Sequence, residues 1–227
     1  MISLLLPTRK RIKFLSRCLE SLKGSDSNDY EIIFRLDDDD SDTLDYVKSL
    51  DSIQKKIIVG PRLGGYADLH IYYNECCEIA EGDFLWLFND DITIKEKNID
   101  WASIMLEYKD REIVLDIVSY YTTMPDQIMK GMFPAMHRKL YEVLGHFSLN
   151  NHNDSYLIEV FRKGNPELWK ILETPSLWTY RNEMGDDITG LEAASVLSKT
   201  TAAFGSLENT NNILKDIQKI KNYLKKS

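Results

Sequence analysis

The residues most able to do chemistry in this sequence are an amide and two acids that follow an apolar run. Phe84–Phe88 is apolar without interruption, and Asn89, Asp90 and Asp91 come directly after it. An apolar run of this length predicts a strand buried on both faces, as in parallel sheets. Carboxylates at the end of such a strand are costly to bury without a partner, so they predict a cation site. A turn whose acids face solvent is the alternative.

Three more polar stretches follow predicted strands, namely Pro7-Thr8-Arg9, Asp37 to Asp42, and Gly60 to Gly65. Apolar residues at helical spacing separate these strands, so residues 1–91 predict the order β-α-β-α-β-α-β and a parallel sheet with right-handed crossovers. Ligands of open parallel sheets bind outside the carboxyl ends of the strands. All four polar stretches fall at that end, which favours one functional site over four solvated turns.

The second half of the chain has a less regular pattern. Helices are predicted at residues 101–108, 137–144 and 154–162, and a strand at 113–120. Glycine and proline predict a loop at 124–133, whereas 172–180 is either an edge strand or an extended segment, and 191–204 is ambiguous.

The tail, residues 207–227, predicts an amphipathic helix. Its apolar stripe consists of Ile213, Ile217, Ile220 and Leu224. We expect this helix to dock on its own domain, and a homodimer formed through it is the alternative.

Composition limits the classes of protein. The chain has 227 residues, a net charge of -8 and a pI near 5.1, which suits one α/β domain, alone or with a small appendage. The acidic balance argues against a nucleic-acid partner. Three cysteines without CxxC spacing indicate a reducing compartment. We find no signal peptide and no membrane-spanning segment, so we expect a soluble, cytoplasmic protein.

Two common phosphate-binding motifs are missing from the sequence. Neither GxxxxGK[ST] nor GxGxxG follows a predicted strand, which argues against a dinucleotide-binding dehydrogenase. A bound phosphate would then need a metal ion, with help from Arg9 or Arg11. Two aspartates suit Mg²⁺ or Mn²⁺, which complete their shells with water and substrate phosphates. The histidines His137, His146 and His152 lack zinc-ligand spacing and are predicted to lie in loops or at the surface.

Several segments, in order, resemble the GT-A glycosyltransferases, in particular those similar to family 2. They are residues 2–9, 31–38 and 80–91, followed by the acceptor-side segment 132–147. The resemblance covers most of residues 1–160. It implies an α/β fold of GT-A type, a Rossmann-like, mostly parallel sheet flanked by helices, with the amphipathic helix added at the C-terminus. We therefore expect a glycosyltransferase domain at 1–204, with a nucleotide-binding half at 1–91 and an acceptor-side half at 92–204, and a helix at 205–227.

The resemblance also implies roles for individual residues. The residues expected to bind a nucleotide sugar are Pro7, Thr8, Arg9, Asp37, Asp38, Tyr66, Asn89 and Asp90. Asp91 is expected to hold Mn²⁺ or Mg²⁺, and Asp154 to be the general base. For Asp154 an N-cap role is the alternative, since Asp is a favoured cap residue. The sequence departs from the family pattern at Asn89, where an acid is expected, and no late metal-binding histidine occurs around residues 180–187.

The activity implied is metal-dependent transfer of a sugar, with inversion. The donor would be a nucleotide-diphosphate sugar, most of all a UDP-sugar, and the acceptor a hydroxyl of a carbohydrate or another molecule. A nucleotidyltransferase of related fold is one alternative. A module that binds nucleotide sugars without catalysis is another, and Asn89 together with the missing histidine speaks for it.

Overall fold

The computed structural model describes residues 1–96, 98–121, 124–174, 179–181, 196 and 199–226. The strands are β1 (Ile2–Pro7), β2 (Tyr30–Asp37), β3 (Lys55–Gly60), β4 (Phe84–Leu87), β5 (Ile92–Ile94), β6 (Val114–Tyr121), β7 (Met124–His137), β8 (Trp169–Leu172) and β9 (Thr179–Arg181). Within the described residues they form one nine-stranded sheet in the order β3-β2-β1-β4-β7-β6-β9-β5, with β8 paired to β6. The sheet is the frame on which every candidate residue is mounted.

Strands β1 to β4 form the parallel half of the sheet. Strand β1 pairs with β2 on one side and with β4 on the other, and β3 lies outside β2. The side chains of β2 and β4 are buried along their whole length. The apolar run of β4 predicts this, whereas β2 also buries the charged residues Glu31, Arg35 and Asp37. The predicted β-α-β-α-β-α-β order is confirmed. Because the strand order reverses between β1 and β4, this junction is the topological switch point, where such sheets bind ligands.

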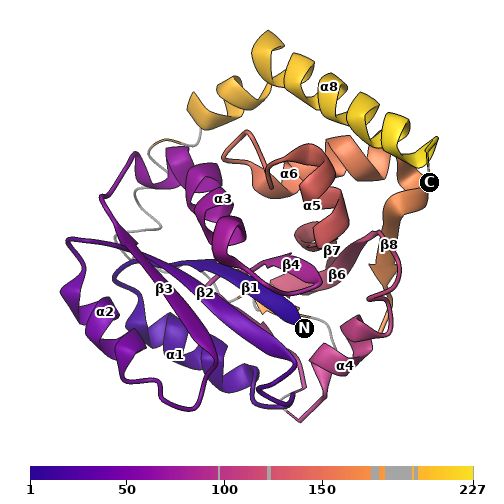
Figure 1. The fold of residues 1–227 in the computed structure, drawn as a ribbon. Coiled ribbons are helices and arrows are strands. Elements are labelled where there is room, and N and C mark those ends of the chain that lie inside the picture. The colour runs from indigo at the N-terminus through magenta and orange to yellow at the C-terminus, as the bar shows by residue number, and fades with distance from the viewer. Residues whose placement is uncertain (97, 122–123, 175–178, 182–195, 197–198, 227) are drawn as a thin grey trace.

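Helices cover both faces of the sheet (Figure 1). They are α1 (Ile12–Ser21), α2 (Ser41–Lys48), α3 (Leu69–Ile79), α4 (Trp101–Leu106), α5 (Arg138–Leu144), α6 (Asn153–Leu157) and α8 (Leu207–Leu224), with short helical turns η1 (Gly65–Asp68), η2 (Ile158–Lys163) and η3 (Pro166–Leu168). Helices α1 and α2 lie on one face and α3 and α5 on the other. This arrangement follows from right-handed crossovers, because the connection from β3 to β4 runs back across the sheet.

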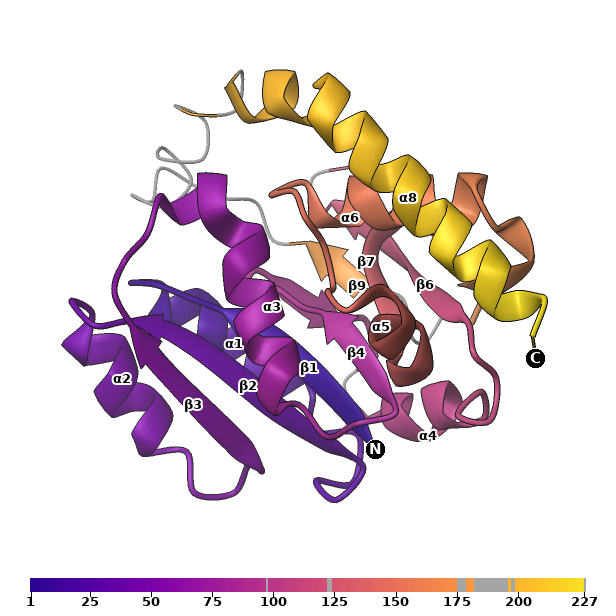
Figure 2. The ribbon, with the colours of Figure 1, turned by 45° about the horizontal axis from the view of Figure 1, so that its top comes forward.

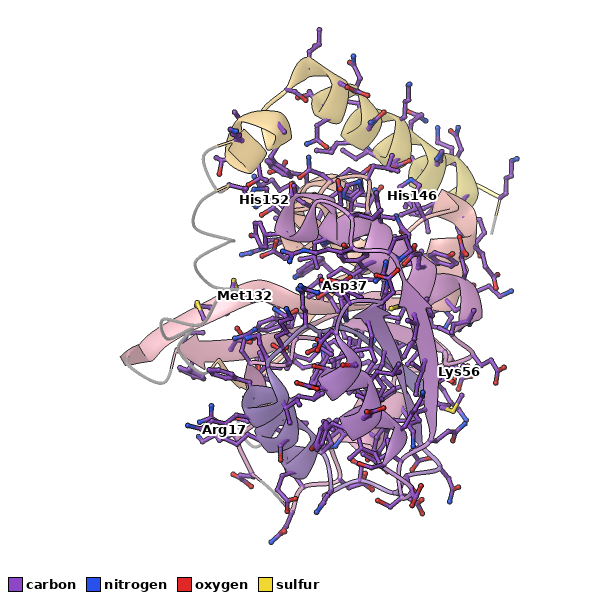
Figure 3. All side chains as sticks on the ribbon, turned by 90° about the vertical axis from the view of Figure 1, so that its left-hand side faces the viewer. Arg17, Asp37, Lys56, Met132, His146 and His152 are labelled. Atoms are coloured by element: carbon purple, nitrogen blue, oxygen red, sulfur yellow. The ribbon has the colours of Figure 1, made fainter. Side chains whose placement is uncertain are left out.

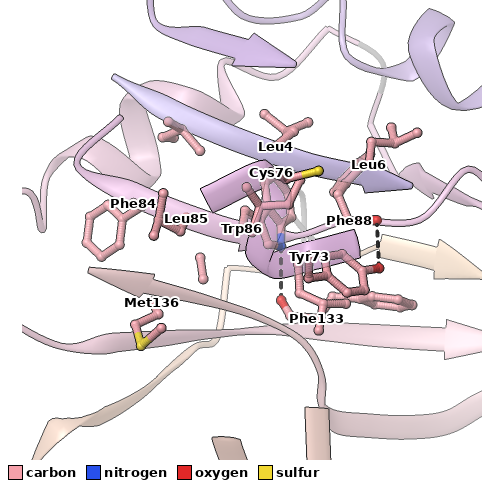
Figure 4. Packing of buried hydrophobic residues seen from close by; sticks show 14 of the residues in the cluster. Leu4, Leu6, Tyr73, Cys76, Phe84, Leu85, Trp86, Phe88, Phe133 and Met136 are labelled. Carbon is pink, nitrogen blue, oxygen red and sulfur yellow. Dashed lines mark hydrogen bonds between the residues drawn. The ribbon is translucent and has the colours of Figure 1, made fainter. Parts of the chain in front are cut away.

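The core is centred on β4, whose side chains are all buried. Trp86 is fully buried, and its indole Nε1 donates to the carbonyl of Phe133 on β7, at 2.9 Å (Figure 4). Its ring lies 5.5 Å from that of Trp101 and 4.7 Å from that of Phe88, measured between centroids. The buried indole therefore has a polar partner as well as apolar contacts, which fixes β4 between the parallel and antiparallel halves.

The antiparallel half differs from the prediction at residues 124–133, which form most of β7 rather than a loop. Strand β7 pairs with β4 on one side and with β6 on the other. Gly131 has a φ of +87° at an irregularity where the register of the β6–β7 pair shifts, and its N–H donates to Asp116 at 2.6 Å. A bulge of this kind absorbs the glycine that seemed to break the strand.

The other predictions for the second half hold in most places. The strand predicted at 113–120 is β6, and the helix predicted at 137–144 is α5. Residues 154–162 fall in α6 and in the wider-wound η2. The segment 172–180 contributes to two strands, β8 and β9, each paired to β6. Half of the ambiguous segment 191–204 lies outside the described residues.

Helix α8 confirms the predicted amphipathic tail helix. Figures 1 and 2 show it running along the outer side of α5 and α6, and it contacts α5 and η2. Ile220 is fully buried, and Ile213 and Leu224 pack against the core. A Cβ at Gly164 would lie 2.5 Å from Ile217, so the glycine permits this close approach. The apolar stripe is thus used within the chain, and the homodimer stays a prediction.

A buried polar cluster fastens α8 as well. Asp216 is almost inaccessible and accepts a hydrogen bond from the hydroxyl of Tyr156. Lys219 Nζ lies 2.9 Å from one of its carboxylate oxygens, and His146 Nε2 lies 3.1 Å from the other. Burial by itself raises the pKa of Asp216, but His146, Tyr156 and Lys219 outweigh it and leave the pKa lowered. His146 lies in the loop between α5 and α6, in agreement with the predicted loop or surface position, and Asp216 of α8 lies beside its ring.

His137 was predicted to lie in a loop or at the surface, but it is the last residue of β7 and is buried. It lies at the N-cap of α5, where its Nδ1 accepts from the N–H of Lys139 at 3.2 Å.

None of the described helices combines the length and the apolar character needed to cross a bilayer. The cytoplasmic location expected from the sequence stays a prediction, as do the domain limits at 204 and 205.

Replacing Asp216 tests how α8 is held. We expect Asp216→Ala to lower the free energy of unfolding by about 3 kcal/mol at pH 7, since it leaves buried donors without their acceptor. Urea denaturation measures this, with the exposed Lys215→Ala as the control. The lowered pKa means that the contribution of Asp216 is present above its ordinary value of 3.8 and is lost as pH falls further. A difference between variant and wild type that does not shrink as pH falls below 3.8 would contradict this assignment.

Candidate functional site

The centre of the site is a buried charge cluster at the switch point between β1 and β4. The hydroxyl of Thr8 donates to Asp90 Oδ2 at 2.6 Å, and Arg11 Nη1 donates to Asp90 Oδ1 at 2.5 Å. Arg11 Nη2 lies 3.8 Å from Asp91 Oδ2. Asp90 is 3% exposed and Asp91 0%, so the alternative of a solvated turn is wrong. Buried carboxylates persist because the cation and the hydroxyl stabilise them.

Asn89 is held from the α3 side of the sheet. The hydroxyl of Tyr73, on α3, donates to Asn89 Oδ1 at 2.6 Å and lies 3.1 Å from the carbonyl of Phe88 (Figure 4). An amide accepts this bond without adding charge beside Asp90 and Asp91, where a third carboxylate would repel the other two. The departure from the family pattern at Asn89 thus has a local physical reason.

The acids after β2 have separate partners. Asp37 accepts from Arg9 Nη1 at 3.3 Å, and Arg9 Nη2 donates to Asp39 at 2.8 Å. Asp40 is the N-cap of α2 and also accepts from the backbone N–H of Lys10 at 2.6 Å. The side chain of Asp38 is exposed at the end of the strand. The loops after β1 and β2 are therefore joined by ion pairs and hydrogen bonds.

Arg35 was not predicted from the sequence to be part of the site. It lies on β2, 2% exposed, and its Nη1 donates to Asp37 Oδ1 at 2.8 Å. Its Nε donates to Glu75 on α3 and its Nη2 to the carbonyl of Pro61, each at 2.8 Å, and its guanidinium lies 4.2 Å from the ring centre of Tyr72. A charged residue inside an apolar strand was the available signal, since such charges are rarely buried without function or partners.

The pKa of Asp37 is raised from its ordinary value, because burial outweighs the charges of Arg35 and Arg9, which lower it. Asp37 therefore depends on two guanidinium groups to remain ionised in a mostly covered position. An acidic acceptor supported in this way is suited to a polar ligand group that brings N–H donors to the edge of the sheet.

The acceptor-side segment is fastened to α3 beside Tyr73. The side chain of Asn74 accepts from the N–H of Phe147 and donates to the carbonyl of Ser148, both at 2.7 Å. The rings of Tyr73 and Phe147 stack at 6.0 Å between centroids. One helix, α3, therefore holds the Asn-Asp-Asp motif with one side chain and the acceptor-side segment with the next.

Asp154 lies in the first turn of α6, where its Oδ1 accepts from the N–H of Ser155 at 2.7 Å. The N-cap position belongs to His152, so the alternative role of Asp154 as the N-cap is wrong. The helix begins two residues earlier than that alternative required. The ring of His152 meets that of Tyr66 edge-on at 6.4 Å, which brings the loop after β3 next to the start of α6.

Three of the candidate acids act electrostatically on Tyr73. Burial raises the pKa of Tyr73 well above its ordinary value, and the charges of Asp91, Asp90 and Asp154 raise it further. Figure 3 looks onto the side of the molecule where β1 to β3 end, with Asp37 near the middle and His152 above it, under α8. The loops after β1, β2, β3 and β4 and the start of α6 thus gather on one side of the molecule.

The residues at this edge fit a divalent ion in kind. Asp90 and Asp91 offer carboxylate oxygens, and Asn89 an amide oxygen, the ligands that Mg²⁺ and Mn²⁺ take. In the part of the chain that the structure describes, no group of three or more His, Cys, Asp or Glu side chains could hold a metal ion. These ions are often bound by one or two carboxylates together with substrate phosphates, so the residues fit an ion that is bound jointly with a ligand.

Residues 180–187, where the sequence has no metal-binding histidine, lie mostly outside the described residues.

An open groove of about 560 Å³ lies between the starts of α1 and α2, next to the loop that carries Arg9. Its lining residues include Lys10, Lys13, Asp39 and Asp42. It is wide and charged, in contrast to the tightly packed junction of β1 and β4.

We expect Arg35→Met to disrupt the edge of the sheet, since Asp37, Glu75 and the carbonyl of Pro61 lose one shared donor. The expected loss is about 3 kcal/mol of unfolding free energy, as for breaking a buried ion pair. Arg35→Lys should recover only part of it, because an ammonium cannot reproduce the planar fork. Urea denaturation measures both, with the exposed Arg17→Met as the control. Equal stability of Arg35→Met and Arg17→Met would show that Arg35 does not organise this edge.

The model of the family described as glycosyl transferase family 2 matches residues 3–164. No curated protein matches the chain. Among solved structures, TarS 1–349 of S. aureus in complex with UDP-GlcNAc is similar, with 15% identity and a TM-score of 0.66, over 95% of this chain and 79% of that one.

Two further solved structures are similar at low identity. The mannosyltransferase PcManGT from Pyrobaculum calidifontis, in complex with GDP-Man and Mn²⁺, has 14% identity and a TM-score of 0.63, over 89% of this chain and 63% of that one. GalNAc-T7 with UDP, GalNAc and Mn²⁺ has 15% identity and a TM-score of 0.56, over 96% of this chain and 55% of that one. These likenesses show the GT-A fold. The chain belongs to glycosyl transferase family 2 and is a glycosyltransferase.

Proposed function

We propose that this glycosyltransferase moves a sugar from a nucleotide-diphosphate sugar to a hydroxyl of a carbohydrate or other acceptor, with inversion. The observation that carries the proposal is the buried cluster of Thr8, Arg11, Asp90 and Asp91 at the switch point of the sheet. A UDP-sugar is our first choice of donor. UDP or UDP-GlcNAc accompanies two of the similar structures, although GDP-Man accompanies a third.

The nucleoside would be bound at the ends of β1 and β2. Pro7, Thr8 and Arg9 line one side, and Asp37 and Asp38 the other, with the carboxylate of Asp37 as an acceptor for base N–H groups. Arg35 is a positioning residue here, because it fixes Asp37 and the loop after β3 together. Tyr66, in that loop, would close the site from the side of α6.

The diphosphate would lie over the ends of β1 and β4. Helices α1, α2 and α3 all begin at this edge, and their first N–H groups favour anions. Asp91 would hold Mn²⁺ or Mg²⁺, with Asp90 and Asn89 beside it. When bound, such an ion stabilises the negative charge that develops on the leaving diphosphate. Arg9 and Arg11 add fixed positive charge at the same place.

Asp154 would be the general base. It follows, in α6, the acceptor-side segment whose end Asn74 and Tyr73 hold against α3, and its charge acts on the same Tyr73 hydroxyl as that of Asp91. A carboxylate there can take the proton of an acceptor hydroxyl while the oxygen attacks the anomeric carbon and the diphosphate leaves. Direct displacement of this kind inverts the configuration at that carbon.

A screen of nucleotide sugars tests the proposed function. We expect thermal stabilisation by UDP-sugars in the presence of Mn²⁺, and slow metal-dependent hydrolysis of at least one of them. Nucleoside triphosphates with a sugar phosphate serve as the comparison, since pyrophosphate release from that pair would favour a nucleotidyltransferase. Neither binding nor hydrolysis of any nucleotide sugar would overturn the proposal.

Asp154→Asn separates donor binding from catalysis. We expect sugar transfer to fall by roughly a hundredfold or more, since general-base catalysis contributes on the order of 10²–10⁴. Donor affinity should change less than threefold, because the residue faces the acceptor. Product formation and calorimetric titration with UDP measure the two quantities. Glu208→Gln, which alters an exposed acid in the first turn of α8, is the matched control. Full transfer activity in Asp154→Asn would remove it as the base.

A further inference from the structure

We propose that Arg11 is a resident counter-ion for Asp90 and Asp91, which keeps a divalent cation out of the site until a nucleoside diphosphate is present. The inference rests on the proposed function, because it concerns how the donor and the ion bind. It assigns Arg11 a positioning role, whereas the sequence predicted only that Arg11 could help to neutralise a bound phosphate. Its basis is the geometry and the charge balance of the buried cluster.

The two acids are close neighbours in a covered position. They are consecutive in the chain and 3% and 0% exposed, so water screens their mutual repulsion poorly. One oxygen of Asp90 receives the Thr8 hydroxyl and the other the guanidinium of Arg11, which also lies 3.8 Å from Asp91. The cation thus occupies the space between the two carboxylates and the β1–α1 loop.

Arg11 is fixed in this position. It is the N-cap residue of α1, its side chain is 7% exposed, and its guanidinium carbon lies 4.6 Å from the ring centre of Phe14. By comparison, Arg9 is engaged by Asp37 and Asp39 on the other side of the loop. A surface arginine would pair with acids transiently, whereas the buried guanidinium of Arg11, packed against the ring of Phe14, is kept beside the two carboxylates.

The charges explain the expected order of binding. Two carboxylates and one guanidinium leave a net charge of about -1, and a divalent ion placed there alone would face the guanidinium at short range. A diphosphate brings further negative charge and oxygen atoms that a guanidinium can bind in bidentate fashion. With the diphosphate present, Arg11 can balance phosphate instead of Asp90 and Asp91, and carboxylate oxygens become available as ligands.

Two consequences follow for binding equilibria. In the wild type, UDP and Mn²⁺ should each strengthen the binding of the other, and linkage requires the same factor from both sides. Without the guanidinium, the acid pair should attract Mn²⁺ directly. Arg11→Gln should therefore bind Mn²⁺ alone more tightly and gain less from UDP. Arg11→Lys keeps the charge but not the fork, so it should resemble the wild type more than Arg11→Gln does.

The experiment measures free Mn²⁺ by electron paramagnetic resonance during titration, with and without UDP. We expect UDP to tighten Mn²⁺ binding at least tenfold in the wild type. In Arg11→Gln, Mn²⁺ alone should bind about tenfold more tightly than in the wild type, with the UDP effect reduced to threefold or less. Arg17→Gln, on the exposed face of α1, is the control and should match the wild type.

Equal affinity of the wild type and Arg11→Gln for Mn²⁺ alone would overturn the inference, as would tight Mn²⁺ binding by the wild type without UDP. Should Arg11→Gln fail to fold by circular dichroism, the wild-type titrations still decide, because independent binding of UDP and Mn²⁺ contradicts the inference. Failure of the proposed function is a different result, in which no nucleotide sugar is bound or hydrolysed. Hydrolysis of a donor together with unlinked Mn²⁺ binding would reject the role of Arg11 alone.

Discussion

The structure depends on the neutralisation of two adjacent carboxylates at the centre of the sheet. Asp90 and Asp91 lie where β4 ends, beside the end of β1, and neither is open to water. A hydroxyl and a guanidinium from the β1–α1 loop stabilise them in this buried position. Arg11, which supplies the guanidinium, lies 79 residues before Asp90 in the sequence. The same interaction joins β1 to β4 and creates the place where a charged ligand can bind.

Around this pair, the site is assembled by residues that bridge elements. Arg35 links β2, the loop after β3 and α3, while consecutive residues of α3, Tyr73 and Asn74, hold the Asn-Asp-Asp motif and the acceptor-side segment. Helix α8 lies on the far side of α5 and α6, fastened by Asp216. The Asn-Asp-Asp motif and residues 147–148, about 60 positions apart in sequence, are thus connected through one helix, α3.

The prediction from sequence was most accurate in the first half of the chain. Apolar runs and helical spacing there give the order of strands and helices, and parallel pairing then places all four polar stretches at one edge. It was least accurate at residues 124–133, where Gly131 sits in a bulge of β7 rather than in a loop. The N-cap alternative for Asp154 was wrong for a similar reason, because α6 begins at Asn153 and a one- or two-residue shift changes the role.

By itself, the sequence determined the local properties: which segments are buried strands, which are helices, and that an amide and two acids stand at the end of β4. These follow from periodicity and from the cost of burying charge, both of which act over a few residues. The tertiary structure alone decided the partners, such as Arg11 with Asp90, Thr8 with Asp90 and Tyr156 with Asp216. Such pairs depend on how sheet, loops and helices pack in three dimensions, and contacts across 60 or more residues leave no periodic pattern in one chain.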